Sequence, residues 1–187
     1  GFSCIKLKIG VDWNAEKQIL KSLREQFPKD KIELRVDANG GFSPAEAKKV
    51  LEELAELDIH SIEQPIQAGN WKAMAELCHS TPTPIALDEE LIGVLNYESK
   101  KTLIKEIKPQ YIILKPALVG GFSGSDEWIQ LAEQNNIGWW ITSALESNIG
   151  LNAIAQYTYI KNNPMPQGLG TGGLFTNNFE TNLHLEG

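Results

Sequence analysis

The chain has 187 residues, a size at which a single domain can bury a sizeable apolar core. Hydrophobic residues make up 42% of the sequence and charged residues 22%, which is typical of a soluble globular protein. The formal net charge of −7 disfavours a nucleic-acid partner, because phosphate contacts need clustered lysine and arginine. No apolar run reaches the length of about 18 residues that a membrane-spanning helix needs, so we expect no membrane partner.

Cysteine and histidine are scarce and show no metal-binding spacing. The two cysteines, Cys4 and Cys78, lie far apart, and we interpret them as reduced thiols of a cytoplasmic protein. The amino terminus also lacks the basic start and apolar core of a secretory signal. No two of the three histidines are spaced like zinc ligands on a helix. A bound metal should therefore have oxygen ligands.

Short apolar, β-branched runs alternate along the chain with stretches of helical period. One capping box is visible: Ser43 precedes Pro44, and Glu46 follows three residues after Ser43. In chain order, the sequence predicts a strand at 2–9, a helix at 14–27, a strand at 32–36, a helix at 44–57, a strand at 59–62, a helix at 71–78, a strand at 85–87, a helix at 97–107, a strand at 111–114, a helix at 124–135, a strand at 139–142, a helix at 151–160 and a last short strand near 167–169.

This alternation predicts the fold class. Strands that alternate with helices of such length form a parallel sheet of right-handed βαβ units. The strands are almost continuously apolar, as expected where both faces of a sheet are covered. A closed eight-fold barrel usually takes about 250 residues, and we count seven strands. We therefore expect one α/β domain over residues 1–187, a parallel (β/α) barrel of the TIM type that lacks its first strand.

Charged residues fall where successive strands end. Lys8, Asp37 and Glu63 end the first three strands, Asp88 follows the fourth, and Lys115 ends the fifth. A single charge in such a place is usually a solvated loop residue. Five in succession are harder to explain in that way, because the carboxyl ends of barrel strands all open onto the face where catalytic residues gather.

The residue types predict a metal site with lysines beside it. Three carboxylates brought together repel one another unless a cation neutralises them. Oxygen ligands at a site open to substrate suit Mg²⁺, with Mn²⁺ as the alternative, so we expect Asp37, Glu63 and Asp88 to be the ligands. A lysine close to such a cation, here Lys8 or Lys115, should have a lowered pKa and act as a base. This combination suits removal of a proton beside a carboxylate.

These segments resemble a known family. Lys6-Leu7-Lys8 is similar to the Lys-x-Lys motif of the enolase superfamily, whose lysine or histidine bases work with Mg²⁺. The segments 36–39, 62–65 and 87–89 resemble its three metal-ligand strand ends, and Lys115-Pro116 resembles the opposite-face lysine of the muconate lactonizing enzyme subgroup. The resemblance implies an amino-terminal capping domain and a first barrel strand before the Lys-x-Lys strand, and we expect this chain to lack both.

Two segments near the carboxyl end resemble one branch of that subgroup. Residues 141–150 and 167–172 are similar to those of the o-succinylbenzoate synthases of menaquinone synthesis. The resemblance implies a small carboxylate substrate that loses water. Lys8 would take the proton beside the carboxylate and return it to the departing hydroxyl. Lys115 would stabilise charge as a cation, and Lys6 would modulate the pKa of Lys8, since residues two apart on a strand share a face.

Four further residues are weaker candidates. Asn39 and Glu89 could orient the metal ligands, although Asn39 is equally well explained as an ordinary turn residue. Ser143 and Ala144, at the end of the sixth strand, are expected to contact the second carboxylate of the substrate through backbone N–H groups. The sequence carries no signal for the oligomeric state.

Two other functions stay open on the sequence alone. Racemisation or epimerisation, for example of an N-acylamino acid or a dipeptide, would use Lys8 and Lys115 on opposite faces of one carbon. The Asp-x-Asp segment that dipeptide epimerases usually carry near the last strand is not present. The second alternative is a barrel fragment that binds metal without catalysing a reaction, since the loops of a capping domain help to close such sites.

Overall fold

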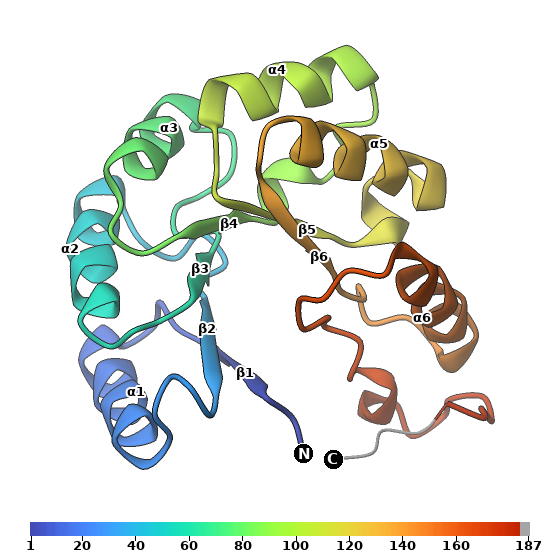
Figure 1. The fold of residues 1–187 in the computed structure, drawn as a ribbon, viewed down its shortest axis with the longest axis horizontal. Helices are drawn as coiled ribbons and strands as arrows, with labels where there is room; N and C mark the ends of the chain where they lie inside the picture. The colour runs from blue at the N-terminus through green and yellow to red at the C-terminus, as the bar shows by residue number, and fades with distance from the viewer. Residues whose placement is uncertain (184–187) are drawn as a thin grey trace.

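The computed structural model describes residues 1–183 and contains a sheet of six parallel strands in the order β1-β2-β3-β4-β5-β6. Helices follow the strands and cover the outer face of the sheet (Figure 1). The elements are β1 (Cys4–Lys8), α1 (Trp13–Gln26), β2 (Glu33–Asp37), α2 (Pro44–Ala55), β3 (Ser61–Glu63), α3 (Trp71–Ser80), β4 (Ile85–Leu87), η1 (Glu89–Leu91), α4 (Tyr97–Ile107), β5 (Tyr111–Leu114), η2 (Pro116–Leu118), α5 (Gly121–Gln134), β6 (Gly138–Ile141), α6 (Asn148–Lys161) and η3 (Gly172–Leu174).

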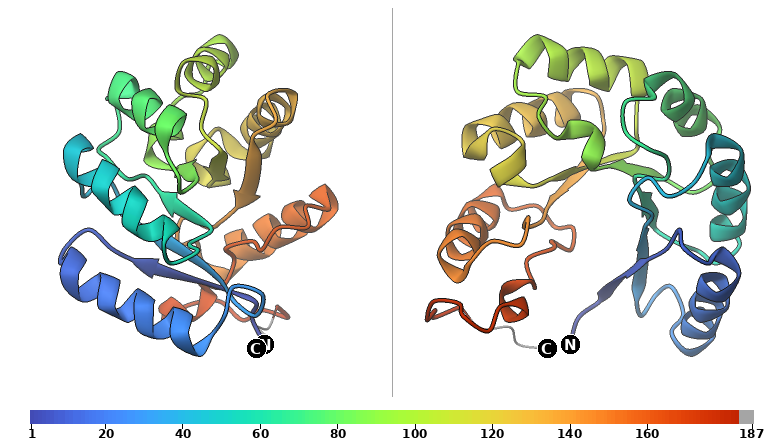
Figure 2. Two further views of the ribbon diagram at one scale, coloured as in Figure 1. Left: turned by 60° about the vertical axis from the view of Figure 1, so that its left-hand side comes forward. Right: turned by 180° about the vertical axis from the view of Figure 1, so that it is seen from behind.

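The strands form an open arc, as Figure 1 and the right-hand view of Figure 2 show. Every neighbouring pair is parallel, which confirms the predicted α/β class with a barrel-type parallel sheet. The prediction of a seventh strand near 167–169 is wrong. Gly168 forms only an isolated parallel bridge to Thr142, because the glycine-rich chain turns into η3 directly afterwards.

Local sequence accounts for most helix boundaries. Both hydrogen bonds of the predicted capping box form at the start of α2, where Ser43 pairs with Glu46. Helix α5 begins three residues earlier than predicted. Gly120 precedes it with φ of 99° and Gly121 follows with φ of 71°, a left-handed conformation that glycine adopts without steric cost.

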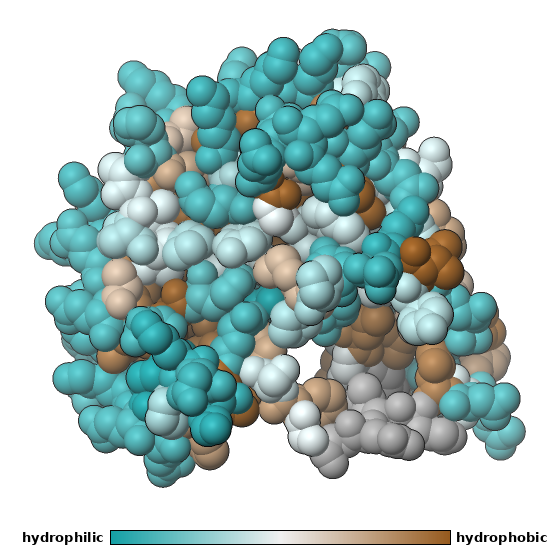
Figure 3. Space-filling model, viewed as in Figure 1, coloured by the Kyte–Doolittle hydropathy of each residue, from teal (hydrophilic) through white to brown (hydrophobic). Residues whose placement is uncertain are grey.

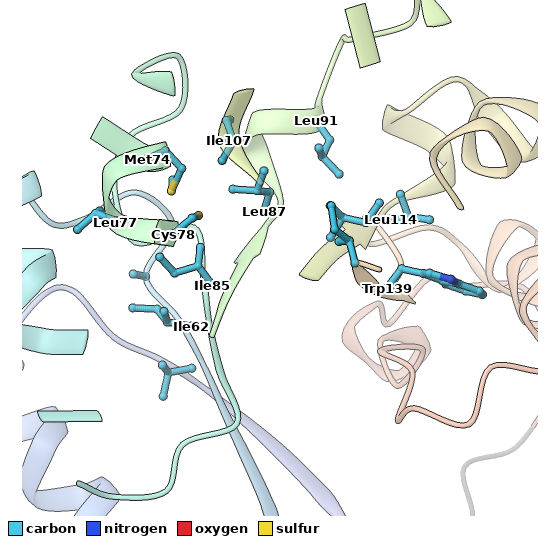
Figure 4. Close-up of a cluster of buried hydrophobic side chains, with 14 of the residues drawn as sticks. Ile62, Met74, Leu77, Cys78, Ile85, Leu87, Leu91, Ile107, Leu114 and Trp139 are labelled. Atoms are coloured by element: carbon cyan, nitrogen blue, oxygen red, sulfur yellow. The ribbon is translucent and has the colours of Figure 1, made fainter. Parts of the chain in front are cut away.

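The main apolar core lies between the sheet and the helices. Leu34, Val36, Ile62 and Leu87 are at most 1% exposed and pack against residues of the helical layer. Figure 4 shows the part of this cluster between β3, β4 and α3, including Met74. Full burial of each such side chain contributes roughly 1.5–3 kcal/mol. The alternate positions of the strands point to the concave side.

Strand register brings the charged strand ends to one level. Lys8 is paired with Asp37 between β1 and β2, and Asp37 is paired with Glu63 between β2 and β3. Each of these residues is the last of its strand. Because parallel strands end at the same edge of a sheet, their side chains are delivered to one rim of the arc.

The face of the molecule that Figure 3 shows is mainly hydrophilic. In the view of Figure 3 it is hollowed near the lower middle, on the open side of the arc. Among the described residues, none of the helices is long and apolar enough to cross a membrane.

Candidate active site

A cavity of about 780 Å³ extends along β1 from Phe2 and Cys4 to Lys8 and reaches the carboxyl ends of β2, β5 and β6, whereas Glu63 and Asp88 are not part of its lining. Its charged lining comes from strands on both sides of the arc, since β1 supplies Lys6 and Lys8, β2 supplies Asp37, and Lys115 follows β5. The β6 side of the cavity is formed by Thr142, Ser143, Ala144 and Leu145, together with Gln167, Gly168, Gly170 and Thr171. The structure therefore brings both predicted catalytic lysines to one cavity.

Lys8 is bound to the end of the neighbouring strand. Its Nζ atom donates to Asp37 Oδ2 at 2.5 Å and also to Asn39 Oδ1. The Lys8 side chain is 66% exposed, whereas that of Asp37 is 2% exposed. The lysine thus reaches the cavity from the solvent side and contacts one buried carboxylate.

Lys6 lies deeper than Lys8 and bridges two carboxylates. Its Nζ atom is 2.7 Å from Glu63 Oε2 and 3.2 Å from Asp37 Oδ2. Burial opposes the charge on Lys6, but the two carboxylates outweigh burial and raise its pKa. Lys6 is therefore held as a cation, between Glu63 and the carboxylate that Lys8 contacts.

The two buried acids of β2 and β3 respond differently to their surroundings. Burial would raise the pKa of Asp37, but Lys6 and Lys8 lower it below its usual value. Burial raises the pKa of Glu63 to about 8, and the negative charges of Asp37 and Asp88 add to this effect against Lys6. Glu63 Oε1 is buried and has no hydrogen-bond partner. A further positive charge close to Glu63 Oε1 would therefore stabilise the ionised form of this carboxyl group.

Asp88 and Lys115 form a separate pair at the ends of β4 and β5. Lys115 Nζ donates to Asp88 Oδ2, and the two side chains are 19% and 2% exposed. Lys6, Lys8 and Lys115 therefore contact all three predicted metal ligands in this structure.

The two supporting candidates contact each other. Asn39 Nδ2 donates to Glu89 Oε1 at 2.8 Å, and its Oδ1 accepts from Lys8. The backbone N–H of Asn39 donates to Asp37 Oδ1 at 3.0 Å, and its φ of 43° is left-handed. Asn39 therefore serves as a turn residue and also links Lys8 to Glu89, so the two interpretations are compatible.

The predicted backbone donors at the end of β6 have acceptors within the chain. Ser143 N–H donates to Gly168 O at 3.3 Å, and Ala144 N–H donates to Glu146 Oε2 at 2.7 Å. Ser143 Oγ also contacts Thr171 Oγ1. A substrate carboxylate would have to replace these acceptors. Glu146 and Thr171 were not predicted as site residues. They lie inside the segments 141–150 and 167–172, but their residue types alone do not indicate these contacts.

The three acids suit a divalent cation by their chemistry. Glu63 has an unpartnered buried oxygen, and three carboxylates at adjacent strand ends offer only hard oxygen donors. As the side chains are arranged, no three His, Cys, Asp or Glu residues within 1–183 stand close enough to hold a metal ion. The lysine contacts described above would have to be exchanged when a cation enters.

Comparisons with known proteins identify the family. The profile described as enolase C-terminal domain-like matches residues 1–180. An o-succinylbenzoate synthase of Desulfotalea psychrophila is 54% identical over 188 residues, which cover 100% of this chain and 51% of that protein. An L-amino acid-D/L-Glu epimerase of Francisella philomiragia is 33% identical over 158 residues, which cover 83% of this chain and 43% of the relative.

Solved structures give the same relationship. The crystal structure of MenC from Desulfotalea psychrophila has a TM-score of 0.95 at 53% identity and covers 100% of this chain and 51% of that one. Muconate lactonizing enzyme from Pseudomonas putida has a TM-score of 0.83 at 26% identity, with 93% of this chain and 48% of that chain covered. The chain spans about half the length of the curated relatives it matches.

Proposed function

Because this chain belongs to the enolase C-terminal domain-like family and, within the enolase superfamily, to the muconate lactonizing enzyme subgroup, we propose that it carries the acid–base and metal-binding residues of an o-succinylbenzoate synthase of menaquinone synthesis. The observation that carries the proposal is the similarity to a synthase of that name along the whole chain. The reaction is a dehydration of 2-succinyl-6-hydroxy-2,4-cyclohexadiene-1-carboxylate, and its substrate is a small carboxylate. Two free thiols, Cys4 and Cys78, fit the cytoplasmic location that we infer.

Lys8 is the residue that moves the proton. Its neutral amine takes the proton from the carbon beside the substrate carboxylate, and the electron pair of that C–H bond passes into the carboxylate. As an ammonium, Lys8 then gives the proton to the hydroxyl on the neighbouring carbon. The electron pair returns from the carboxylate to form a C=C bond between the two ring carbons, the C–O bond breaks, water leaves, and the ring becomes aromatic. The exposed position of Lys8 at the cavity supports contact with a substrate.

Lys115 and Lys6 would remain cations. Lys115 approaches the cavity from β5, across the arc from Lys8, where its charge would attract the negative charge that develops on the substrate. Lys6, held by Glu63 and Asp37, would place its positive charge beside the same Asp37 carboxylate that Lys8 contacts.

Asp37, Glu63 and Asp88 would hold Mg²⁺, or Mn²⁺ in its place. When bound, the cation supplies positive charge that stabilises the developing negative charge on the substrate carboxylate. Asn39 and Glu89 would position Lys8 and the turn after Asp37 through the hydrogen bonds that join them.

Epimerisation is the second candidate, and the similarity to an epimerase favours it. Lys8 and Lys115 stand on β1 and beside β5, so each could exchange a proton on one face of the same carbon. In that reaction both lysines must titrate, whereas dehydration needs only Lys8 to do so.

One assay distinguishes the synthase, the epimerase and the non-catalytic fragment. The 187-residue chain with Mg²⁺ is given the cyclohexadiene carboxylate and, separately, an N-acylamino acid in D₂O. Aromatic product that disappears in Lys8→Ala supports the synthase. Deuterium in the amino acid without aromatic product would contradict the synthase proposal and support an epimerase. Binding of Mg²⁺ with neither reaction would favour the non-catalytic fragment.

A further inference from the structure

Gln64, the residue after Glu63, is fully buried and uses the whole hydrogen-bonding capacity of its side chain. Its Oε1 atom accepts from the N–H groups of Asp88 at 3.2 Å and Glu90 at 3.3 Å. Its Nε2 atom donates to Ile66 O at 3.0 Å and to Glu90 Oε2 at 3.0 Å. One side chain directly after β3 therefore holds the backbone that follows β4.

The backbone of Gln64 joins the same strand ends. Its N–H donates to Ala86 O on β4 at 2.9 Å, and its carbonyl accepts from Gly40 N–H, after β2, at 2.7 Å. Gln64 thus contacts the ends of the three strands that carry Asp37, Glu63 and Asp88.

Two features argue for more than ordinary packing. The φ of Gln64 is 37°, a left-handed conformation that costs a non-glycine residue free energy and persists where its surroundings impose it. Its partner Glu90 is 5% exposed and also accepts from Gly69 N–H at 2.7 Å, which ties in the loop before α3. Gln64 and Gly69 thus each donate to one carboxyl oxygen of the buried Glu90, so neither oxygen is left without a partner.

We propose that Gln64 is a positioning residue that fixes the three carboxylate-bearing strand ends relative to one another, with Glu90 as its partner. This proposal rests on the metal site of the proposed function. Ligand geometry for Mg²⁺ is demanding, so a small displacement of Asp88 from Glu63 weakens the site without removing a ligand.

The test exchanges donor and acceptor. In Gln64→Glu, a carboxylate oxygen would face Glu90 Oε2 and Ile66 O, so two attractions become repulsions. We expect Mg²⁺ affinity, measured by calorimetry, to fall about 10- to 100-fold. The added negative charge alone would raise the Mg²⁺ affinity, because it attracts the cation. The double variant Gln64→Glu/Glu90→Gln restores the donor–acceptor pair between positions 64 and 90 at the original net charge, while the repulsion from Ile66 O remains, so we expect it to recover part of the lost affinity.

Gln67→Glu is the matched control, because it makes the same substitution at an exposed position three residues later. Its Mg²⁺ affinity should equal or exceed that of the unmodified chain. Unchanged affinity in Gln64→Glu, or a double variant as weak as that single variant, would overturn the proposal.

A second measurement does not depend on metal. In the metal-free chain, Gln64→Met should make the Asp88 and Glu90 amides exchange with solvent about tenfold faster, because both lose their acceptor. Unchanged exchange at both amides contradicts the positioning role. If the unmodified chain binds no Mg²⁺ while these amides do respond, the positioning role stands and the metal site of the proposed function fails.

Discussion

Lys8 and Asp37 are register partners on neighbouring parallel strands, and their side chains are also joined by a 2.5 Å hydrogen bond at the mouth of the cavity. The lysine is mostly exposed while the aspartate is almost completely buried. Removing the lysine therefore takes away a group that can reach a substrate, and it leaves the core of the arc intact.

Lys8→Ala should reduce the dehydration rate by about 10²- to 10⁴-fold, the usual range for losing a general acid–base group. The midpoint of thermal unfolding should change little, because the Lys8 side chain is 66% exposed. Lys29→Ala is the control: Lys29 precedes β2, its side chain is 68% exposed and paired with Asp58, and neither residue lines the cavity. Full activity in Lys8→Ala would exclude the proposed role of Lys8.

Glu63 should make the metal-free protein less stable as the pH rises. Its pKa in the folded state is about 8, against 4.5 without the protein environment, so the folded state binds more protons between these values. Its contribution to stability is complete below pH 4.5 and is lost as the pH rises through 8. The loss is on the order of 1 kcal/mol per pH unit within that window.

Glu63→Gln should therefore flatten this pH dependence in denaturant unfolding of the metal-free chain. Glu52→Gln, at an exposed position of α2, should leave it unchanged. The same slope in the unmodified chain and in Glu63→Gln would show that Glu63 is not the titrating group.

His60 should produce the opposite trend at lower pH. Burial lowers its pKa, and Arg35 adds to this effect against the charge of Glu33. The unfolded chain then binds a proton below about pH 6.5 that the folded chain does not, so stability is lost as the pH falls through that value. His60→Gln should reduce this loss in unfolding experiments, whereas His79→Gln, at an exposed position, should not.

Gly124→Ala should destabilise the chain, although alanine in a helix is normally better than glycine by about 1 kcal/mol. A Cβ atom at this position in α5 would lie 2.2 Å from Val119 O and 3.4 Å from Lys100 Nζ. Relief of that clash must move α5 away from the loop after η2, at a cost of roughly 1–3 kcal/mol. A rise in the free energy of unfolding would contradict the close contact.

Tertiary contacts explain where sequence-based prediction was incomplete. The helix over Tyr97–Ile107 was predicted to the residue, since its apolar period and caps are local signals. The prediction of a strand near 167–169 was wrong, since Gly168 forms only an isolated bridge. A short run of residues does not show whether a neighbouring strand pairs with it along its length. The positioning role of Gln64 and Glu90 was not predicted, because the role of an amide or a carboxylate depends on the groups to which it is hydrogen-bonded.

Residue order alone predicts the succession of strands and helices, and it places five charged residues at strand ends: Lys8, Asp37, Glu63, Asp88 and Lys115. Both follow from periodicity and from the position of each residue within its own element. Three contacts become visible in the folded chain and in no local pattern: Lys6 bridges Glu63 and Asp37, Glu146 accepts from the Ala144 N–H, and Gln64 joins three strand ends. These contacts join residues from different loops and strands, and their distances depend on register and on the curvature of the sheet.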